Sequence, residues 1–159
     1  MIRQAKREDL SKLITLARSF HKRSTYRDYE LDEMEMYRSL SGVLSQKLGF
    51  LHVADHYGVL TGMLAGAVQS LWFSRDQYAS DLIFVSRREG DGDLLIKAFV
   101  DWAFTFPRVR ECTLAVSSGI HPKETGELYE RHGFEYLGPM FMMTKDGYEQ
   151  SLERHQEGV

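Results

Sequence analysis

Apolar residues recur along the chain at two different spacings, and the change from one spacing to the other predicts an alternation of helices and strands. Four segments carry apolar residues three or four positions apart, which is typical of amphipathic helices packed on a core. These helices are predicted at residues 10–20, 31–48, 95–106 and 122–132. Pro122 suits the first turn of the last helix, and Gly133 suits its C-terminal end.

Shorter apolar runs lie between the helices and are rich in β-branched and aromatic residues, as strands are. The predicted strands cover residues 2–5, 50–54, 59–68, 78–86 and 112–116, followed by the segments "FEYL" and "MFMMT" near the C-terminus. Strands that alternate with helices late in a chain favour parallel pairing in part of the sheet. The pattern therefore predicts an α/β (α+β) fold around a mixed sheet.

Length and composition favour one compact domain. The chain has 159 residues, of which 43% are hydrophobic and 27% are charged, so it can bury a core without disulfides. No repeat, linker or low-complexity segment divides it. We therefore expect a single domain at residues 1–145, followed by a polar C-terminal tail at residues 146–159.

Charge and cysteine content narrow the classes of partner and the compartment. The formal net charge is -3 and no stripe of Lys and Arg is visible, which argues against nucleic-acid binding. Cys112 is the only cysteine, which fits a reducing compartment. The N-terminus lacks the apolar core of a secretory signal, and the run at residues 59–68 is too short to span a bilayer. We expect a cytoplasmic protein with no membrane partner.

The stretch "LIFVSRREGDGDLL" leads from a predicted strand through a glycine-containing turn into a helix. Unpaired N–H groups at such a helix start, together with the helix dipole, can hold a phosphate or pyrophosphate group. The same stretch is also compatible with a plain strand-to-helix turn. Three carboxylates in it would repel a phosphate, and they belong to Glu89, Asp91 and Asp93.

Two segments together resemble the GNAT superfamily of acyl-CoA N-acyltransferases. "RREGDG" fits the family pattern [QR]-x-x-G-x-[GA], and "ELYERHGF" is similar to the later signature LYEKxGF. The element order resembles the family over about residues 1–145. This resemblance implies a GNAT fold, with a mixed central sheet of about six to seven strands, splayed fourth and fifth strands, and about four flanking helices.

The resemblance also implies a binding site for acetyl-CoA as co-substrate, in a cleft between the strands at residues 78–86 and 112–116. The pantetheine arm would pair with the backbone of Phe84, Val85 and Ser86. The pyrophosphate would lie on the glycine-containing loop, whose residues are Arg87, Arg88, Gly90, Asp91, Gly92 and Asp93.

Two candidate catalytic residues follow from the same resemblance. Tyr129 falls on the family tyrosine, which protonates the departing CoA thiolate, whereas a tyrosine before a glycine cap also often packs on a sheet. Asp81 lies where related enzymes often have an acid that deprotonates the amine, and a solvated strand carboxylate is the alternative. His121 is a second candidate for that base.

The resemblance implies an N-acetyltransferase that transfers an acyl group from acetyl-CoA to a primary amine of a small molecule or protein. The alternative is a non-catalytic GNAT-fold module with a degenerate CoA site, of the kind found in bacteria and their phages. The short glycine-containing loop with its acidic residues favours this alternative.

Edge strands near the C-terminus would suit a homodimer. We expect no metal site, because His52, Asp55 and His56 fall across a strand end and a turn, with no further ligand nearby in the sequence. A cationic acceptor could be drawn by acidic residues that equally suit a solvated helix face, namely Asp28, Glu30, Asp32, Glu33 and Glu35.

Overall fold

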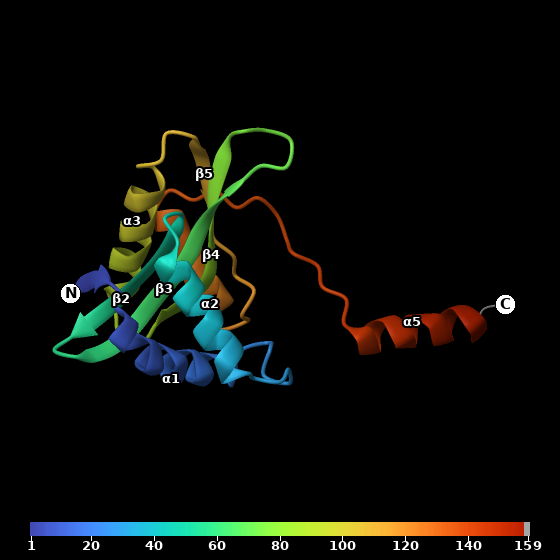
Figure 1. The fold of residues 1–159 in the computed structure, drawn as a ribbon. Coiled ribbons are helices and arrows are strands. Elements are labelled where there is room, and N and C mark those ends of the chain that lie inside the picture. Colours follow the sequence, from blue (N-terminus) through green and yellow to red (C-terminus); the bar gives the residue numbers. More distant parts are fainter. Residues whose placement is uncertain (158–159) are drawn as a thin grey trace.

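The computed structural model describes residues 1–157, with side chains described for residues 1–154, and it is built around one five-stranded sheet (Figure 1). The strands lie in sequence order, and all neighbours are antiparallel except the last two, which are parallel. The strands are β1 (Ile2–Gln4), β2 (Gly49–His56), β3 (Val59–Ser70), β4 (Gln77–Ser86) and β5 (Val109–Thr113). This confirms the predicted mixed α/β sheet.

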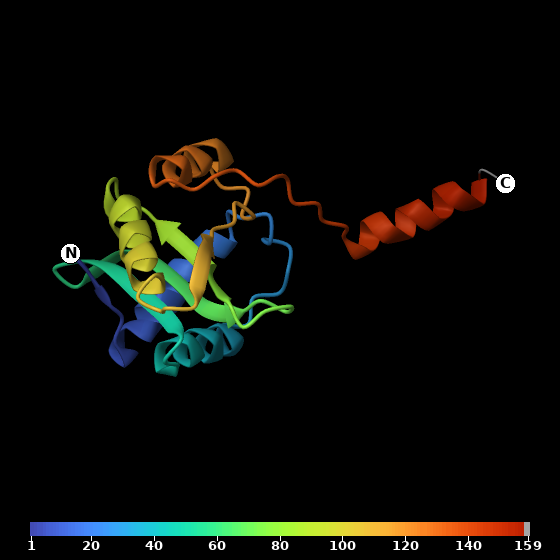
Figure 2. The ribbon, with the colours of Figure 1, turned by 90° about the horizontal axis from the view of Figure 1, so that it is seen from above.

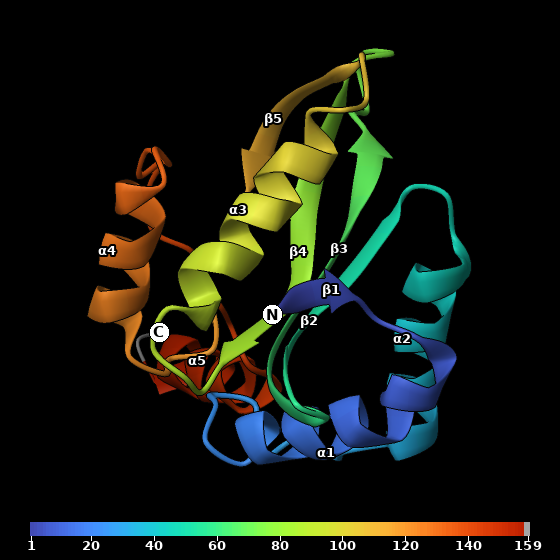
Figure 3. The ribbon, with the colours of Figure 1, turned by 90° about the vertical axis from the view of Figure 1, so that its left-hand side faces the viewer.

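Helices cover both faces of the sheet (Figure 3). One apolar cluster joins helices α1 and α2 to the sheet through Leu13, Leu40 and Met63, and a second joins α3 and α4 to it through Phe99 and Tyr129. No helix within residues 1–157 is long and apolar enough to cross a membrane. The helices are α1 (Leu10–His21), α2 (Glu33–Ser45), α3 (Asp91–Ala103), α4 (Pro122–Arg131) and α5 (Lys145–Glu157), with a 3-10 turn η1 (Arg7–Asp9) before α1.

Local capping explains where two helices begin or end. Asp32 accepts hydrogen bonds from the backbone N–H groups of Met34 and Glu35, so α2 starts at Glu33 rather than at residue 31. Gly133 follows α4 with φ 84°, a left-handed conformation that glycine adopts without strain and that terminates helices. The predicted helix end at Gly133 is therefore confirmed.

The prediction of strands in "FEYL" and "MFMMT" is wrong, and within residues 1–157 five strands form instead of six or seven. Residues 134–144 form an extended segment without strand pairing, which leads to α5 away from the rest of the fold (Figure 2). These apolar runs have strand composition, but composition does not supply a neighbouring strand, and pairing is what makes a strand.

The strands β4 and β5 diverge, as the resemblance implied. They pair only over Gln77–Ser80 of β4, and β4 then continues to Ser86 with no strand on its β5 side (Figure 3). The register of β3 and β4 shifts at this point, because Gly66 pairs with Asp81 and Ala65 with Ile83, which leaves Leu82 as an extra residue. Such a bulge bends a strand and changes the direction of its side chains.

The bulge requires a glycine at position 66. A Cβ added to Gly66 would lie 2.5 Å from the Ser80 carbonyl oxygen and 2.8 Å from Cε2 of Phe99. We expect Gly66→Ala to lower the free energy of unfolding by roughly 1–3 kcal/mol, measured by denaturant titration. Gly126→Ala is the matched control, because nothing lies within 4 Å of its added Cβ and α4 should gain about 0.5–1 kcal/mol. Equal stability of both variants would contradict the role of Gly66.

Candidate active site

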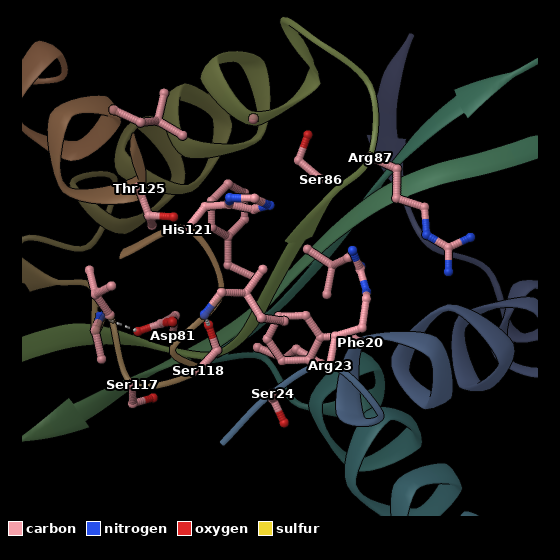
Figure 4. A pocket seen from close by; sticks show the side chains of 18 of the residues that line it. Phe20, Arg23, Ser24, Asp81, Ser86, Arg87, Ser117, Ser118, His121 and Thr125 are labelled. Carbon is pink, nitrogen blue, oxygen red and sulfur yellow. Dashed lines mark hydrogen bonds between the residues drawn. The ribbon is translucent and has the colours of Figure 1, made fainter. Parts of the chain in front are cut away.

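A cavity of about 1290 Å³ lies where β4 and β5 diverge (Figure 4). Its wall includes the second half of β4, the loop that opens α3, the segment after β5, one side of α4 and the end of α1 with the loop that follows. The volume exceeds the roughly 300–1,000 Å³ of ordinary ligand pockets, so the cavity can hold a long ligand together with a smaller one.

The peptide group of Ala115 lies between the two candidate catalytic side chains. Its N–H donates to Oδ1 of Asp81 over 3.2 Å, and its carbonyl oxygen accepts from the Tyr129 hydroxyl over 3.3 Å. These side chains take the backbone groups that a longer β5 would have used for pairing. The fifth strand therefore ends at Thr113 rather than at residue 116, and the prediction of a strand at residues 112–116 was shifted by three residues.

Asp81 is half-buried beside the bulge in β4. Burial raises the pKa of its carboxyl above the ordinary value, although hydrogen bonds from the backbone N–H groups of Ala115 and of Asp81 itself act against this. A carboxylate with a raised pKa is a stronger base than an exposed one, which is the property needed to accept a proton from an ammonium group. His121, the other candidate base, lines the same cavity from an exposed loop position.

The ring of Tyr129 packs in the core, and its hydroxyl forms a hydrogen bond. Only 6% of its surface is exposed, and its ring lies against Phe84 and Phe134 at centroid distances of 6.2 and 6.0 Å. Burial, and secondarily the charge of Asp81, raises the pKa of its phenol well above the ordinary value. Tyr129 therefore keeps its proton at neutral pH, lines the cavity and donates that proton to the Ala115 carbonyl oxygen.

The loop between β4 and α3 presents a row of unused donors. Among the described residues, the backbone N–H groups of Arg88, Glu89 and Gly90 donate to no acceptor. Gly90 has φ 83°, and open space surrounds the position of a Cβ there. Consecutive free N–H groups next to a helix start form a concave site for an anion. Of the two interpretations of this stretch, the geometry therefore favours a phosphate-binding loop over a plain strand-to-helix turn.

The carboxylate of Asp91 is turned into the protein rather than into the cavity. Its side chain is buried, and it accepts hydrogen bonds from Oγ1 of Thr61 and from Nε2 of His56. Burial opposes ionisation, but the hydrogen bonds from Thr61 and His56 together with nearby positive charge, including that of Arg88, hold the pKa of Asp91 below its ordinary value. Asp91 thus connects the start of α3 to β2 and β3. Because its carboxylate points away from the loop surface, it would repel a phosphate bound there less than the sequence suggested.

The side chains of Arg88 and Asp93 are also held in place by hydrogen bonds. Nη1 of Arg88 donates to Nδ1 of His56 over 2.8 Å, so the imidazole proton lies on Nε2, toward Asp91. Asp93 accepts from Nε2 of His132 over 3.0 Å and from Nη2 of Arg131 over 3.5 Å, which joins α3 to α4. Arg87 forms no ion pair in the described part of the chain and remains available to a ligand.

At the other end of the cavity, two loops close on each other. Thr25 donates through its N–H to the carbonyl oxygen of Ser118 over 2.8 Å and through its hydroxyl to that of Ser117 over 3.0 Å. These bonds join the segment after α1 to the segment after β5. Around them Phe20, Arg23, Ser24 and His121 line the cavity (Figure 4). Arg23 forms no ion pair within the described residues, although its Nε donates to the carbonyl oxygen of Ser19.

The acidic residues before α2 and in its first turn lie outside the cavity wall, and three of them have local roles. Asp32 caps α2, Glu33 pairs with Arg18, and Glu35 pairs with Arg38. A solvated helix end therefore explains these three better than attraction of a cationic acceptor does.

Two residues of "HVADH" have protein partners. His56 is bonded to Asp91, and the Asp55 carboxylate pairs with Arg3. Within residues 1–154, no group of three His, Cys, Asp or Glu side chains is arranged to hold a metal ion.

Most of the residues proposed from the sequence line this one cavity. They are Asp81, Phe84, Val85, Ser86, Arg87, Arg88, Gly90, Gly92, Asp93 and Tyr129, whereas the Asp91 side chain lies behind the loop. Sequence reasoning missed Thr61, His56 and the Ala115 peptide, because only chain folding brings them to the site. No local sequence signal marks these contacts.

Known proteins share the fold at low sequence identity. No protein-family model matches the chain, and a comparison with curated protein sequences finds no match. Among solved structures, a putative acetyltransferase from Agrobacterium tumefaciens is 21% identical, with a TM-score of 0.70 over 91% of this chain and 99% of that one.

Two further structures agree with the first. An aminoglycoside 6'-N-acetyltransferase from Acinetobacter haemolyticus is 14% identical with a TM-score of 0.68, over 91% of this chain and 97% of that one. A predicted acetyltransferase with acetyl-CoA from Clostridium acetobutylicum is 15% identical with a TM-score of 0.69, over 91% and 95%. The chain therefore has the fold of the GNAT-type acetyltransferases.

Proposed function

We propose that this protein is an N-acetyltransferase that transfers the acetyl group of acetyl-CoA to a primary amine. One observation carries the proposal: a single cavity joins a loop of free N–H groups at one end to the Asp81–Ala115–Tyr129 arrangement further along β4. An anion site and an acid–base pair on the same cavity are what a CoA-dependent acyl transfer requires.

The loop and β4 would hold the co-substrate. The N–H groups of Arg88, Glu89 and Gly90 suit the pyrophosphate, and Arg87 could add a charged contact. From Asp81 to Ser86, β4 has no strand partner on its β5 side, so backbone groups near Phe84 are free to pair with the pantetheine amides. When bound, acetyl-CoA supplies an activated acyl group as a thioester.

Asp81 and Tyr129 would divide the proton transfers between them. Asp81 accepts the proton that the amine must lose before its nitrogen attacks the thioester carbonyl carbon. The carbon–sulfur bond then breaks, and Tyr129 protonates the departing thiolate. The raised pKa of Tyr129 keeps this proton on the phenol at neutral pH and also makes the phenol a weaker acid. To reach the thiolate, the hydroxyl would turn from the Ala115 carbonyl oxygen to the sulfur atom.

The acceptor would enter between the end of α1 and the segment after β5. Phe20 offers an apolar surface there, and Arg23 offers a cation without a carboxylate partner among the described residues. One structural neighbour is named as acting on aminoglycosides, which supports an acceptor with amino groups. We therefore propose a small molecule or a protein side chain whose primary amine lies toward Asp81, with an anionic or neutral polar group near Arg23.

Two binding measurements with acetyl-CoA test the proposal, calorimetric titration and thermal unfolding. A thiol-release assay with a panel of amines then tests catalysis. Ligand at about 100 times its Kd should stabilise the protein by about 2.7 kcal/mol and raise Tm by a few degrees. Saturable binding and amine-dependent release of CoA are the expected results. Absence of binding at millimolar acetyl-CoA would favour the alternative, a GNAT-fold module without catalysis.

Substitution at Gly90 tests the anion site directly. We expect Gly90→Glu to weaken acetyl-CoA binding by roughly 10- to 100-fold relative to Gly90→Gln, measured by calorimetry. Both variants place the same side-chain shape at the left-handed position, so backbone strain is matched and only the charge differs. Equal affinities in the two variants would mean that the loop does not face the pyrophosphate.

A further inference from the structure

The loop between β4 and α3 is held by two residues at the end of the β2–β3 hairpin. The imidazole of His56 accepts a hydrogen bond at Nδ1 from Nη1 of Arg88 over 2.8 Å, and its Nε2 donates to the two oxygens of the Asp91 carboxylate over 2.9 and 3.1 Å. Thr61 donates its hydroxyl to the same carboxylate over 2.5 Å, and its carbonyl oxygen accepts the Arg87 N–H over 2.9 Å. His56 therefore bridges the first residue of the row of free N–H groups and the residue that follows the row.

A bulge in the hairpin brings these two side chains to one carboxylate. The register of β2 and β3 shifts next to Asp55, which leaves Thr61 as an extra residue in β3. Such a bulge changes the direction of the side chains around it. The turn beyond His56 is also fixed, because the Asp55 carboxylate accepts from Nε of Arg3 over 2.8 Å and from the Gly58 N–H over 2.7 Å. His56 thus reaches the loop from a hairpin end that is itself held by hydrogen bonds.

The backbone orientation of the loop is tied to the same residues. The Arg88 carbonyl oxygen accepts from Oγ of Ser86 over 3.1 Å and from the Asp91 N–H over 3.2 Å. The peptide bond that follows is trans, so the Glu89 N–H points opposite to that carbonyl oxygen and away from its two donors. The direction of this free donor therefore depends on where Arg88 and Asp91 are fixed, and His56 contacts the side chains of both.

We propose that His56 is a positioning residue for the anion site, which holds the loop in the conformation that binds the phosphate groups of acetyl-CoA. The inference rests on the proposed function, because it concerns the co-substrate at the same loop. Within the described residues His56 does not line the cavity, so its effect on the ligand passes through Arg88 and Asp91. A loop that is ordered before binding loses less conformational freedom when the ligand arrives, and the affinity is higher for that reason.

A histidine suits this place because a neutral imidazole accepts at one ring nitrogen and donates at the other. Arginine and lysine side chains only donate, and an ionised carboxylate only accepts, so none of them could join Arg88 to Asp91 in this way. The Asp91 side chain is only 5% exposed, and a buried carboxylate needs donors. Without His56, Thr61 would be its one remaining side-chain donor among the described residues, and the guanidinium of Arg88 would lose its hydrogen bond.

Replacing His56 by phenylalanine tests the proposal, because phenylalanine keeps a flat ring and removes both ring nitrogens. We expect the calorimetric Kd of acetyl-CoA to rise roughly 10-fold or more. His52→Phe is the matched control, since it makes the same change four residues earlier in β2. The ring of His52 stacks on Phe50 at a centroid distance of 4.1 Å, and its buried Nδ1 has no hydrogen-bond partner. His52→Phe should therefore leave the Kd unchanged, and an equal Kd in both variants would overturn the proposal.

Two further substitutions each keep one of the two links, and they carry the test if His56→Phe does not fold. In His56→Gln the amide N–H can still donate to Asp91, whereas in His56→Asn the amide oxygen can still accept from Arg88. Each should weaken acetyl-CoA binding, and each by less than His56→Phe does. Wild-type affinity in both variants would overturn the bridging role of His56.

The charge at position 90 separates positioning of the loop from a general effect on the fold. The ratio of the acetyl-CoA Kd values of Gly90→Glu and Gly90→Gln should shrink by about threefold or more when His56→Phe is also present, because a displaced loop no longer presents that charge to the phosphates. An unchanged ratio would mean that His56 is merely structural, and would overturn the proposal. If the wild-type protein binds acetyl-CoA and His56→Phe binds it equally well, this inference alone fails. If the wild-type protein does not bind acetyl-CoA, the proposed function fails, and this inference fails with it.

Discussion

Replacing Tyr129 by phenylalanine should lower kcat for acetyl transfer by roughly 100-fold or more, with the Kd of acetyl-CoA nearly unchanged. The ring of Tyr129 packs against Phe84 and Phe134, and phenylalanine preserves those contacts. Only the hydroxyl is lost, together with its hydrogen bond to the Ala115 carbonyl oxygen. The loss therefore falls on proton donation to the thiolate rather than on binding.

Steady-state kinetics with thiol detection and calorimetry on the same preparation separate the two effects. Tyr136→Phe is the matched control, because Tyr136 is exposed in the segment after α4 and lines no part of the cavity. It should retain the wild-type kcat. If Tyr129→Phe also retained the wild-type kcat, then Tyr129 would be a packing residue and the acid would have to be sought elsewhere.

Replacing Asp81 by asparagine should lower kcat/KM by roughly 100- to 10,000-fold without destabilising the fold. Asparagine keeps an oxygen that can accept the Ala115 N–H, so the connection to the segment after β5 persists. It cannot accept a proton from the amine. A structural role for Asp81 would predict loss of stability along with activity, whereas the proposed role predicts loss of activity alone.

The pH dependence of the same pair of proteins follows from the raised pKa of Asp81. In the wild type, kcat/KM should rise with pH as the carboxyl ionises, with a midpoint above its ordinary pKa of 3.8. The folded protein holds this proton more tightly than the unfolded chain, so the group favours folding at low pH. Its contribution is lost as the pH rises from 3.8 through the raised folded value.

Asp81→Asn should abolish both the pH-dependent rise in activity and this part of the pH-dependent stability. Urea titrations at several pH values measure the second effect. At neutral pH the variant should be as stable as the wild type or more stable, because it no longer buries a charge. A variant that is less stable at neutral pH would contradict this account.

Much of the fold could be predicted from local patterns. Apolar spacing placed all four predicted helices and the first four strands to within a few residues, because the side chains of an element reach the core only at its own period. Gly133 marked the end of α4 for a local reason, the left-handed conformation of the residue after a helix. The position of Tyr129 one turn before that glycine was therefore readable from the chain alone.

The composition of an element did not predict its partners. "MFMMT" has the residues of a strand, yet it lies extended and unpaired, because a strand requires a neighbour and the sequence does not name one. The end of β5 was likewise set by contacts from far along the chain, since Asp81 and Tyr129 engage the peptide of Ala115.

The sequence by itself determined the helices, the strand-to-helix loop with its glycines and the presence of a tyrosine before Gly133, because each depends on neighbours a few residues away. Only the tertiary structure decided which way the charges of that loop point. Asp91 is 30 residues from Thr61 and 35 from His56, and those hydrogen bonds turn its carboxylate inward. They keep this carboxylate away from the loop residues that line the cavity, because a buried carboxylate is stable only where donors reach it.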